Sequence, residues 1–378
     1  MLSLYKMWEV IDLKVEHEAY KPELLPLSSD RIDVNIFLDA LIDANTMLEV
    51  YKAKVNDSKL NKFWFLPTLQ HKETLASSLL EGTQATLNGV LVDQVSPDDK
   101  DNNLIEIRNY DIATIFGYKY LSRNEFNIEL ILELHKHLMS DNVGLSNDEI
   151  GAFRNKQNYI GKMNKTHEIT FTPPVFQEVP ILIENLLSYI INPQDNLRPL
   201  VKTAIMHAQF ETIHPFMDGN GRVGRILIPL YLYYAKQIDL PCFFISEALE
   251  RDKMKYYTLL NNTRNKGQWS EWIKFFLETV TTQCKKYIKT VSNINKLYEE
   301  HLTVACSLVR SNQMSALVNL LYKYPVINAA TVAKETEIPT ASINRYLNLL
   351  VEAGVLYTDN KSRNRNFFYY DLLNIIQE

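Results

Sequence analysis

One short segment of the sequence gathers several residue types that act on phosphates. Residues 214–225 read His-Pro-Phe-Met-Asp-Gly-Asn-Gly-Arg-Val-Gly-Arg. A strongly apolar helical pattern starts at Arg222, so Arg222 and Arg225 lie three residues apart on one face of its first turn. Cations are disfavoured at the positive end of a helix dipole, by about 0.3–1 kcal/mol each. Two arginines at this position therefore indicate a bound anion.

The turn before this helix supplies the other parts of an anion site. Gly219 and Gly221 let the backbone approach a ligand closely, and the free N–H groups of a first helical turn bind anions. Asp218 offers a carboxylate of the kind that holds Mg²⁺ together with substrate phosphates. His214 suits proton transfer near neutral pH. A polyphosphate is the most economical ligand. The alternative, a plain turn between two helices, leaves the paired arginines unexplained.

This segment resembles the Fic (Fido-fold) signature His-x-Phe-x-Asp/Glu-Gly-Asn-Gly-Arg-x-x-Arg at every specified position. The resemblance extends over residues 30–285. Gly151-Ala152-Phe153-Arg154 is similar to the family's Gly-x-x-Arg. Pro173-Pro174 resembles the segment that closes the hairpin flap of the family. The resemblance implies a mostly α protein, a Fido helical bundle with a short β-hairpin flap.

The resemblance also implies an activity, the transfer of AMP from ATP to a Tyr, Thr or Ser hydroxyl of a protein. His214 would take the hydroxyl proton, Asp218 would bind Mg²⁺, and pyrophosphate would leave. Arg222 and Arg225 would hold the β- and γ-phosphates. The other implied nucleotide neighbours are Gly219, Asn220, Gly221, Ile160, Gly161, Lys162, Met163, Tyr256 and Tyr257. For the two tyrosines, ordinary core packing is the alternative.

Residues 158–172 resemble the family's flap, which aligns a target by strand addition. The segment contains two short runs with strand character on either side of a polar turn at residues 164–166. A flap that recruits backbone encodes little side-chain specificity. The target protein is therefore not readable from the sequence, although self-modification (auto-AMPylation) is expected.

A second motif supplies a carboxylate for Arg225. If the helix of about residues 70–82 ends near Gly82, Glu81 lies at the negative end of its dipole and favours a cationic partner. The motif Ser77-Ser78-Leu79-Leu80-Glu81-Gly82 resembles the family's inhibitory signature Ser/Thr-x-x-x-Glu-Gly/Asn. The resemblance implies that Glu81 binds Arg225 and displaces the γ-phosphate, and that Ser77 helps hold the helix. The alternative is a surface glutamate.

Helical periodicity positions these motifs. It predicts helices at residues 33–54, from after Pro67 to Gly82, 104–120, 128–138, 179–191, 199–213, 222–236, 246–263 and 269–289, the last continuing towards Val309. We expect an N-terminal helical region with the inhibitory helix (1–105), a Fic catalytic core (106–290), a linking helix (291–311) and a winged helix-turn-helix (312–378).

The terminal segment, residues 312–378, has helical patterns at 314–324, 329–336 and 340–353, followed by an apparent hairpin. Residue types suited to DNA contact are Thr340, Ser342, Asn344, Arg345, Lys361, Arg363 and Arg365. Acidic residues balance them: Glu335, Glu337, Glu352, Asp359 and Asp371. DNA binding, dimerisation and protein recognition all stay open.

The chain has 378 residues, of which 46% are hydrophobic, with a net charge of −5 and a pI of about 6.0. Three unpatterned cysteines and no evident signal peptide predict a cytoplasmic protein. The apolar stretch 226–235 is too short to span a bilayer, so no membrane partner is expected. By analogy with Fic proteins we expect a homodimer. Two alternatives to an AMP transferase are a nucleotide-sensing transcriptional regulator and a de-AMPylase that uses Glu81.

Overall fold

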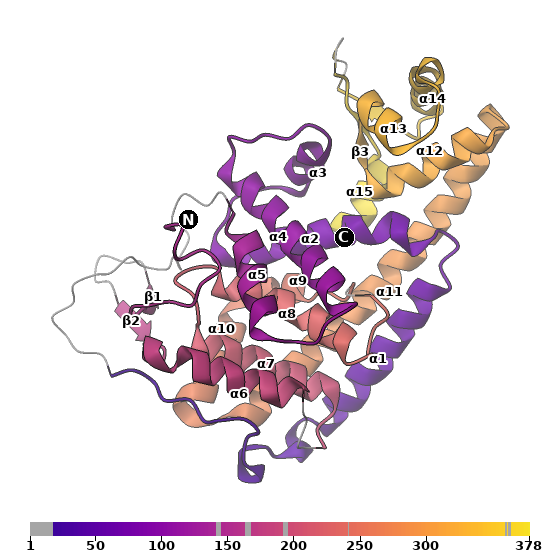
Figure 1. Cartoon of the computed structure of the whole chain (residues 1–378). Coiled ribbons are helices and arrows are strands. Elements are labelled where there is room, and N and C mark those ends of the chain that lie inside the picture. The colour runs from indigo at the N-terminus through magenta and orange to yellow at the C-terminus, as the bar shows by residue number, and fades with distance from the viewer. Residues whose placement is uncertain are drawn as a thin grey trace. The chain divides into compact units, whose positions relative to one another are not determined.

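The computed structural model describes residues 18–140, 145–162, 168–191, 196–240, 242–359, 361 and 364–378, and these residues are mostly helical (Figure 1). The described part forms two compact units. The first comprises residues up to Leu48, Ala76–Gln84 and Ile105–Gln283, and the second comprises Glu49–Leu75, Ala85–Leu104 and residues from Cys284 onward. The predicted mostly α class is confirmed.

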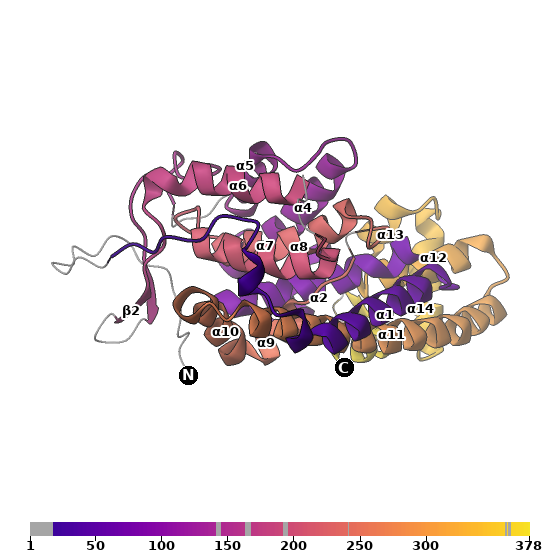
Figure 2. The ribbon, with the colours of Figure 1, turned by 90° about the horizontal axis from the view of Figure 1, so that it is seen from below.

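The centre of the first unit is α7, Pro199–Ile213, which is buried from Leu200 to Ile213. It packs against α6 (Val179–Ile191) and α8 (Asn220–Tyr234), as Figure 2 shows. Trp272 also reaches it and donates to the Ala204 carbonyl over 2.8 Å. The other helices with residues in this unit are α4 (Asn102–Leu121), α5 (Ile128–Leu138), α9 (Ser246–Arg251), α10 (Lys253–Lys266) and the start of α11 (Trp269–Leu308).

The flap hairpin consists of β1 (Ile160–Lys162) and β2 (Glu168–Phe171), which pair in antiparallel fashion with Ile160 opposite Phe171. The polar turn expected at residues 164–166 lies outside the described residues. Tyr20 donates its N–H to the Thr172 carbonyl over 3.0 Å and sets its ring against Phe171. A 3₁₀ turn, Phe176–Glu178, follows the hairpin.

Two helices begin at least five residues from their predicted starts, and the predicted helix 246–263 is interrupted at Asp252, between α9 and α10. Residues 29–31 and 34–36 form short 3₁₀ turns, and α1 starts at Leu38 and ends at Asn56. Helix α2, Lys62–Glu81, starts ahead of Pro67 instead of after it. Asn61 accepts from the Phe63 N–H over 3.0 Å and caps the helix start. Because Pro67 is only the sixth residue, its missing N–H removes one bond near the start of the helix.

The end of α2 forms a glycine cap. Gly82 has φ 95°, which glycine adopts without strain. Its N–H donates to the Leu79 carbonyl and the Thr83 N–H donates to the Ser78 carbonyl, each over 3.1 Å. This is the pattern of a Schellman motif. Glu81 is therefore the last residue of α2.

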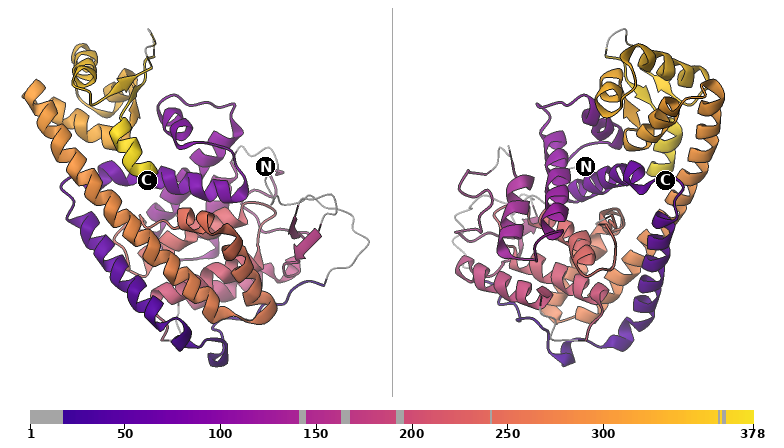
Figure 3. Two further views of the ribbon diagram at one scale, coloured as in Figure 1. Left: turned by 180° about the vertical axis from the view of Figure 1, so that it is seen from behind. Right: turned by 45° about the vertical axis from the view of Figure 1, so that its right-hand side comes forward.

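The second unit contains α3 (Leu87–Val95), α12 (Asn312–Lys323), α13 (Ala329–Glu335), α14 (Thr340–Glu352) and α15 (Tyr370–Gln377). Strands β3 (Val326–Ile327), β4 (Tyr357–Thr358) and β5 (Phe367–Phe368) form an antiparallel sheet in the order β3-β5-β4 (Figure 3, gold). Sequence reasoning did not predict β3 or α15. A strand of two residues is too short to show a period. Asn328 caps α13 by accepting from the Thr331 N–H.

Within the described part of the chain, no helix combines the length and the apolar character needed to cross a bilayer.

Candidate active site

The loop between α7 and α8 is closed by its own side chains. His214 ends α7 in the left-handed region, with φ 50° and ψ 61°. Asn220 accepts from the Phe216 N–H over 2.8 Å and donates to the Phe216 carbonyl over 2.9 Å. Gly219 takes φ 76°, which a glycine allows without strain. The left-handed histidine is a strained residue of the kind found at functional sites.

Arg154 fastens this loop from outside. Its N–H donates to the Pro215 carbonyl over 2.9 Å, and its Nε donates to the His214 carbonyl over 3.0 Å. Asn158, the first residue of the flap segment, donates to the Phe216 carbonyl over 2.9 Å. The arginine of the Gly-x-x-Arg segment therefore holds the backbone at the start of the motif.

His214 is buried and uncharged at neutral pH. Burial, together with the positive charges of Arg154 and Arg264, lowers its pKa to about 3. A neutral imidazole can accept a proton, as a general base must. A polyphosphate bound nearby would raise this pKa and make the ring a stronger base, because a negative charge favours the protonated form.

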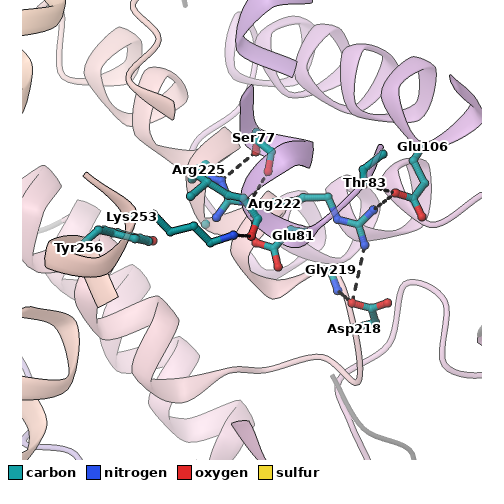
Figure 4. Close-up of polar contacts among 12 residues, drawn as sticks. Ser77, Glu81, Thr83, Glu106, Asp218, Gly219, Arg222, Arg225, Lys253 and Tyr256 are labelled. Atoms are coloured by element: carbon teal, nitrogen blue, oxygen red, sulfur yellow. Dashed lines mark hydrogen bonds and ion pairs between the residues drawn. The ribbon is translucent and has the colours of Figure 1, made fainter. Parts of the chain in front are cut away.

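Arg222 lies beside Asp218 and Glu106 (Figure 4). Its Nη2 is 3.6 Å from the Asp218 carboxylate and its Nη1 is 3.4 Å from Glu106. The side chain is only 4% exposed, and its Nε and Nη1 have no hydrogen-bond acceptor among the described residues. Buried donors without acceptors are costly, so this arrangement fits a guanidinium that binds an anion.

Asp218 fits a magnesium ion that shares its ligands with phosphates. Its side chain is 44% exposed, and one oxygen accepts from the Gly219 N–H over 2.6 Å. The described residues contain no cluster of three or more His, Cys, Asp or Glu that could form an all-protein metal cage. Mg²⁺ is commonly held by one or two carboxylates with phosphates and waters. A single accessible carboxylate therefore suits it.

The structure brings Glu81 and Ser77 onto Arg225 (Figure 4). Arg225 donates to Glu81 Oε1 over 2.6 Å, to the Ser77 hydroxyl over 2.8 Å and to the Ser77 carbonyl over 3.1 Å. Burial alone would raise the pKa of Glu81, but the Arg225 guanidinium holds it below its usual value. Conversely, the Glu81 carboxylate raises the pKa of Arg225 despite the burial of the guanidinium. Both groups are charged.

The Glu81 carboxylate lies directly over the motif. A Cβ added at Gly221 would be 2.3 Å from Glu81 Oε1 and 2.9 Å from Arg225 Nη1. Only glycine therefore leaves room for this ion pair. Gly221 is also a residue predicted to cradle phosphate. The carboxylate thus occupies the space beside Gly221 at the start of α8.

Two further contacts hold the end of α2. Lys253 donates to the Leu80 carbonyl over 2.6 Å, and the Thr83 hydroxyl donates to Glu106 over 2.9 Å. Glu106 is also the residue that faces Arg222. The segment around Glu81 is therefore linked to both arginines of the motif.

The remaining predicted residues lie in two places. Ile160 is half-buried and Gly161 is buried in β1, whereas Met163 and the side chain of Lys162 lie outside what the structure describes. Tyr256 is fully buried, and its hydroxyl is 2.9 Å from His207 Nε2. Tyr257 is half-buried, with its ring centroid 4.9 Å from that of Tyr256.

Sequence reasoning missed His135, which supports the motif from α5. Its ring stacks on Phe216 at 3.8 Å, Nδ1 accepts from the Gly151 N–H, and Nε2 donates to the Asp218 carbonyl over 3.1 Å. Burial lowers its pKa to about 4. The sequence signal that could have identified His135 was its position on the apolar face of an amphipathic helix.

Glu211 was also missed. It is buried, and burial raises its pKa to about 7 even though Arg225 and Arg264 act in the opposite direction. The signal available in the sequence was an acidic residue within a largely apolar helical segment.

Comparisons with known proteins place the chain in a family. The Fic/DOC family matches residues 125–232, and the Fic/DOC family N-terminal region matches residues 38–119. A "Probable protein adenylyltransferase" of Aquifex aeolicus is 24% identical over 257 residues, which cover 62% of this chain and 74% of that protein. A "Protein adenylyltransferase Fic" of Drosophila grimshawi is 25% identical over 57% of this chain, but the match covers only 42% of the fly protein.

Solved structures show the same fold. A Fic family protein from Desulfovibrio desulfuricans superimposes with a TM-score of 0.57 at 21% identity, over 93% of this chain and 98% of that one. A Fic domain containing signaling protein from Bacteroides thetaiotaomicron gives a TM-score of 0.55 at 17% identity, over 66% of this chain and 97% of that one.

Proposed function

Because the chain belongs to the Fic/DOC family, we propose that it transfers AMP from ATP to a Tyr, Thr or Ser hydroxyl of a protein. The observation that carries the proposal is the buried Arg222, whose Nε and Nη1 make no hydrogen bond among the described residues, next to Asp218 and the neutral His214. These are an anion clamp, a magnesium carboxylate and a base, which nucleotidyl transfer to a hydroxyl needs. The names of the relatives support the same reaction.

In the proposed reaction, the triphosphate lies at the start of α8. Arg222 and Arg225 bind the β- and γ-phosphates, and the first-turn N–H groups bind further oxygens. Asp218 would hold Mg²⁺, which when bound neutralises phosphate charge. His214 accepts the proton of the target hydroxyl as the oxygen forms its bond to the α-phosphorus. The bond from that phosphorus to pyrophosphate breaks.

We further propose that Glu81 inhibits this reaction. Its carboxylate occupies Arg225 and the space over Gly221, so a γ-phosphate cannot bind productively. A hydrogen bond to a charged group contributes about 1.5–3 kcal/mol. Removing Glu81 should therefore raise the rate of transfer by roughly 10- to 150-fold.

The test is intact-mass spectrometry of Glu81→Gly after incubation with ATP and Mg²⁺. We expect the added mass of AMP on the protein itself, faster than in the wild type, and its loss when His214→Ala is added. Glu250→Gly, an exposed glutamate of α9, is the matched control. If Glu81→Gly modifies itself no faster than the wild type, the proposed inhibition by Glu81 is wrong. If no variant transfers AMP, the proposed activity is wrong.

The same assay separates the alternative in which Glu81 removes AMP. Glu81 keeps 34% of its side chain exposed, enough to orient a water. Purified AMP-modified Glu81→Gly protein, given to the wild type without ATP, would lose its AMP only if de-AMPylation occurs.

We also propose that residues 312–378 bind duplex DNA. Helix α14 buries Ile343, Tyr346 and Leu347, and it exposes a polar face that includes Asn344 and Arg345. Arg365, between β4 and β5, comes within 3.5 Å of Asn348 on that face. Polar and basic side chains on one helix and an adjacent hairpin suit phosphate and base contacts. In this reading the protein could also act as a nucleotide-sensing regulator. Arg363 lies outside the described residues.

A further inference from the structure

Arg264, on α10, contacts two elements that the proposed reaction has to bring together. Its guanidinium carbon lies 4.0 Å from the centre of the Phe171 ring, which belongs to β2 of the flap hairpin. Its Nε donates to the Thr212 hydroxyl over 3.0 Å, and Thr212 is on α7, two residues before His214. Arg264 therefore connects the hairpin to the helix that ends at the proposed base.

The guanidinium of Arg264 is itself held in place. Its Nη1 donates to Asn261 Oδ1 over 3.1 Å, within the same helix. The Thr212 hydroxyl donates its proton to the Ala208 carbonyl over 2.7 Å, so its oxygen is free to accept from Arg264. Burial lowers the pKa of Arg264 to about 10, and the group is still charged at neutral pH. A charged guanidinium fixed by two acceptors thus lies over the Phe171 ring, the geometry of a cation–π contact.

Phe171 is the point at which this contact acts on both strands of the hairpin. It is the last residue of β2, it is buried, and it pairs with Ile160, the first residue of β1. The Tyr20 ring also contacts it, with the two ring centroids 5.6 Å apart. Because β1 and β2 are joined at this pair, a contact that fixes the Phe171 ring fixes the base of the hairpin.

The backbone on either side of the hairpin is attached separately. Asn158 donates to the Phe216 carbonyl before β1, and Arg154 donates to the Pro174 carbonyl after β2. Two such attachments fix the position of the hairpin but allow it to rotate about the line that joins them. A side chain projects out of the plane of its strands, so a contact through the Phe171 ring opposes this rotation.

We propose that Arg264 is a positioning residue that holds the flap hairpin, through Phe171, at a fixed angle to His214. The proposal rests on the proposed AMP transfer, because it takes the hairpin as the edge to which an extended target adds its backbone. The target hydroxyl has to come within hydrogen-bonding reach of His214, and a hairpin that rotates presents it there less often. The contact lies outside the proposed triphosphate site at the start of α8, so it should affect transfer more than ATP binding.

Two measurements on the Glu81→Gly protein with ATP and Mg²⁺ test the proposal: self-modification by intact-mass spectrometry at saturating ATP, and ATP affinity by titration calorimetry. Arg264→Gln removes the charge, and Phe171→Leu removes the ring. We expect each to slow self-modification by roughly 2- to 30-fold, the effect of one cation–π contact, and to change ATP affinity by less than about twofold. An Arg264 that bound the nucleotide directly would instead lose ATP affinity in Arg264→Gln alone.

Further variants separate the contact from the charge. Arg264 also lowers the pKa of His214, whereas Phe171→Leu leaves that charge in place. Arg264→Lys keeps a cation and Phe171→Tyr keeps a ring, so both should retain most of the rate. The Arg264→Gln/Phe171→Leu double variant should be no slower than the slower single variant, since both break one contact. Lys255→Gln is the matched control, because Lys255 is also on α10 but lies over the ring of Phe275, on α11.

Hydrogen–deuterium exchange tests the contact independently of activity. The amides of residues 168–172 should exchange roughly 2- to 30-fold faster in Arg264→Gln and in Phe171→Leu, and at the parent rate in Lys255→Gln. Circular dichroism first establishes that each variant is folded; if Arg264→Gln is not, the two Phe171 variants decide the question.

Three results would overturn the proposal: unchanged exchange of the flap amides, an ATP affinity that falls as much as the rate, or a Phe171→Leu protein that modifies itself as fast as its parent. Failure of the proposed function looks different. In that case no variant transfers AMP, while the flap amides still exchange faster in Arg264→Gln and Phe171→Leu, and Arg264 fixes the hairpin for another purpose.

Discussion

At the scale of single residues, buried uncharged histidines surround the motif. His135, His207 and His214 have pKa values lowered to about 4, 3 and 3, with burial as the largest cause in each. Each imidazole then offers one donor and one acceptor nitrogen in a defined direction. His135 uses both on backbone groups, and His207 uses one on backbone and one on Tyr256. Neutral histidines thus hold backbone groups and Tyr256 in place without competing for anions.

These shifts predict that the protein loses stability in mild acid. A histidine with a lowered folded pKa contributes stability above its unfolded pKa of about 6.5, and the contribution is lost as the pH falls. Between pH 6.5 and 5 each histidine accounts for at most about 2 kcal/mol. Glu211 acts oppositely, because its pKa is raised to about 7, so its contribution grows as the pH falls below that value. The stability lost through the three histidines outweighs the stability gained through Glu211.

Thermal unfolding between pH 7.5 and 5 measures this effect. The midpoint should fall with pH, and His207→Gln should show a shallower fall because one of the three groups is removed. A midpoint that is independent of pH over this range would contradict the pKa shifts on which the prediction rests.

At the scale of elements, the end of α2 determines where Glu81 points. The Schellman motif at Gly82, the Lys253 ammonium on the Leu80 carbonyl and the Thr83–Glu106 hydrogen bond all lie within one turn of Glu81. The negative end of the helix dipole and an acidic last residue would repel each other in isolation. The cations Lys253 and Arg225 relieve that repulsion. The packing partners of α2, more than its own residues, therefore stabilise this end.

Replacing Gly82 by alanine should weaken inhibition. Gly82 has φ 95°, and a left-handed conformation costs an L residue roughly 1–2 kcal/mol. Strain at the helix end should shift Glu81 away from Arg225, so self-modification with AMP should accelerate, by up to roughly tenfold. Gly354→Ala is the matched control, since Gly354 has φ 74°, has open surroundings and lies in the second unit. Equal rates in the two variants would argue against a role for this cap.

At the scale of the whole molecule, the second unit combines residues far apart in the chain. Thr68 of α2 donates to the Tyr322 carbonyl over 2.6 Å, and Asn328 donates to the Val95 carbonyl over 3.1 Å. Residues 312–378 thus share a packed unit with parts of α2 and α3 and are not a module joined only by a linking helix. A function of that segment has to be tested in the full chain.

DNA binding is tested with the full chain and a short labelled duplex, by fluorescence anisotropy over 50–200 mM salt. Affinity should fall steeply with salt, because each phosphate contact contributes about −0.9 to the slope of log K against log salt. Lys361→Ala should reduce the slope by about one. Arg251→Ala, an exposed arginine of the first unit, is the control. An absence of binding at 50 mM salt would refute the proposal.

Many secondary-structure elements could be predicted because they depend on residues that are close together in the sequence. Apolar periodicity predicted the helices, and a polar turn between two short apolar runs predicted the flap hairpin. Paired first-turn arginines predict an anion site, which stays a prediction. The helix starts were less accurate, because Asn61 could cap α2 ahead of a proline that costs it only one bond.

The contacts between residues distant in sequence followed from packing. A carboxylate and a guanidinium 144 residues apart meet because Gly221 leaves room between them. His207 reaches the backbone of α8 because Gly224 lets two helices approach. Local periodicity carries no information about such distances, since they depend on side-chain volumes at the contact of two helices. The residue types at the start of α8 thus follow from the sequence, whereas the partners that hold Arg225 in place follow from how α2 packs against it.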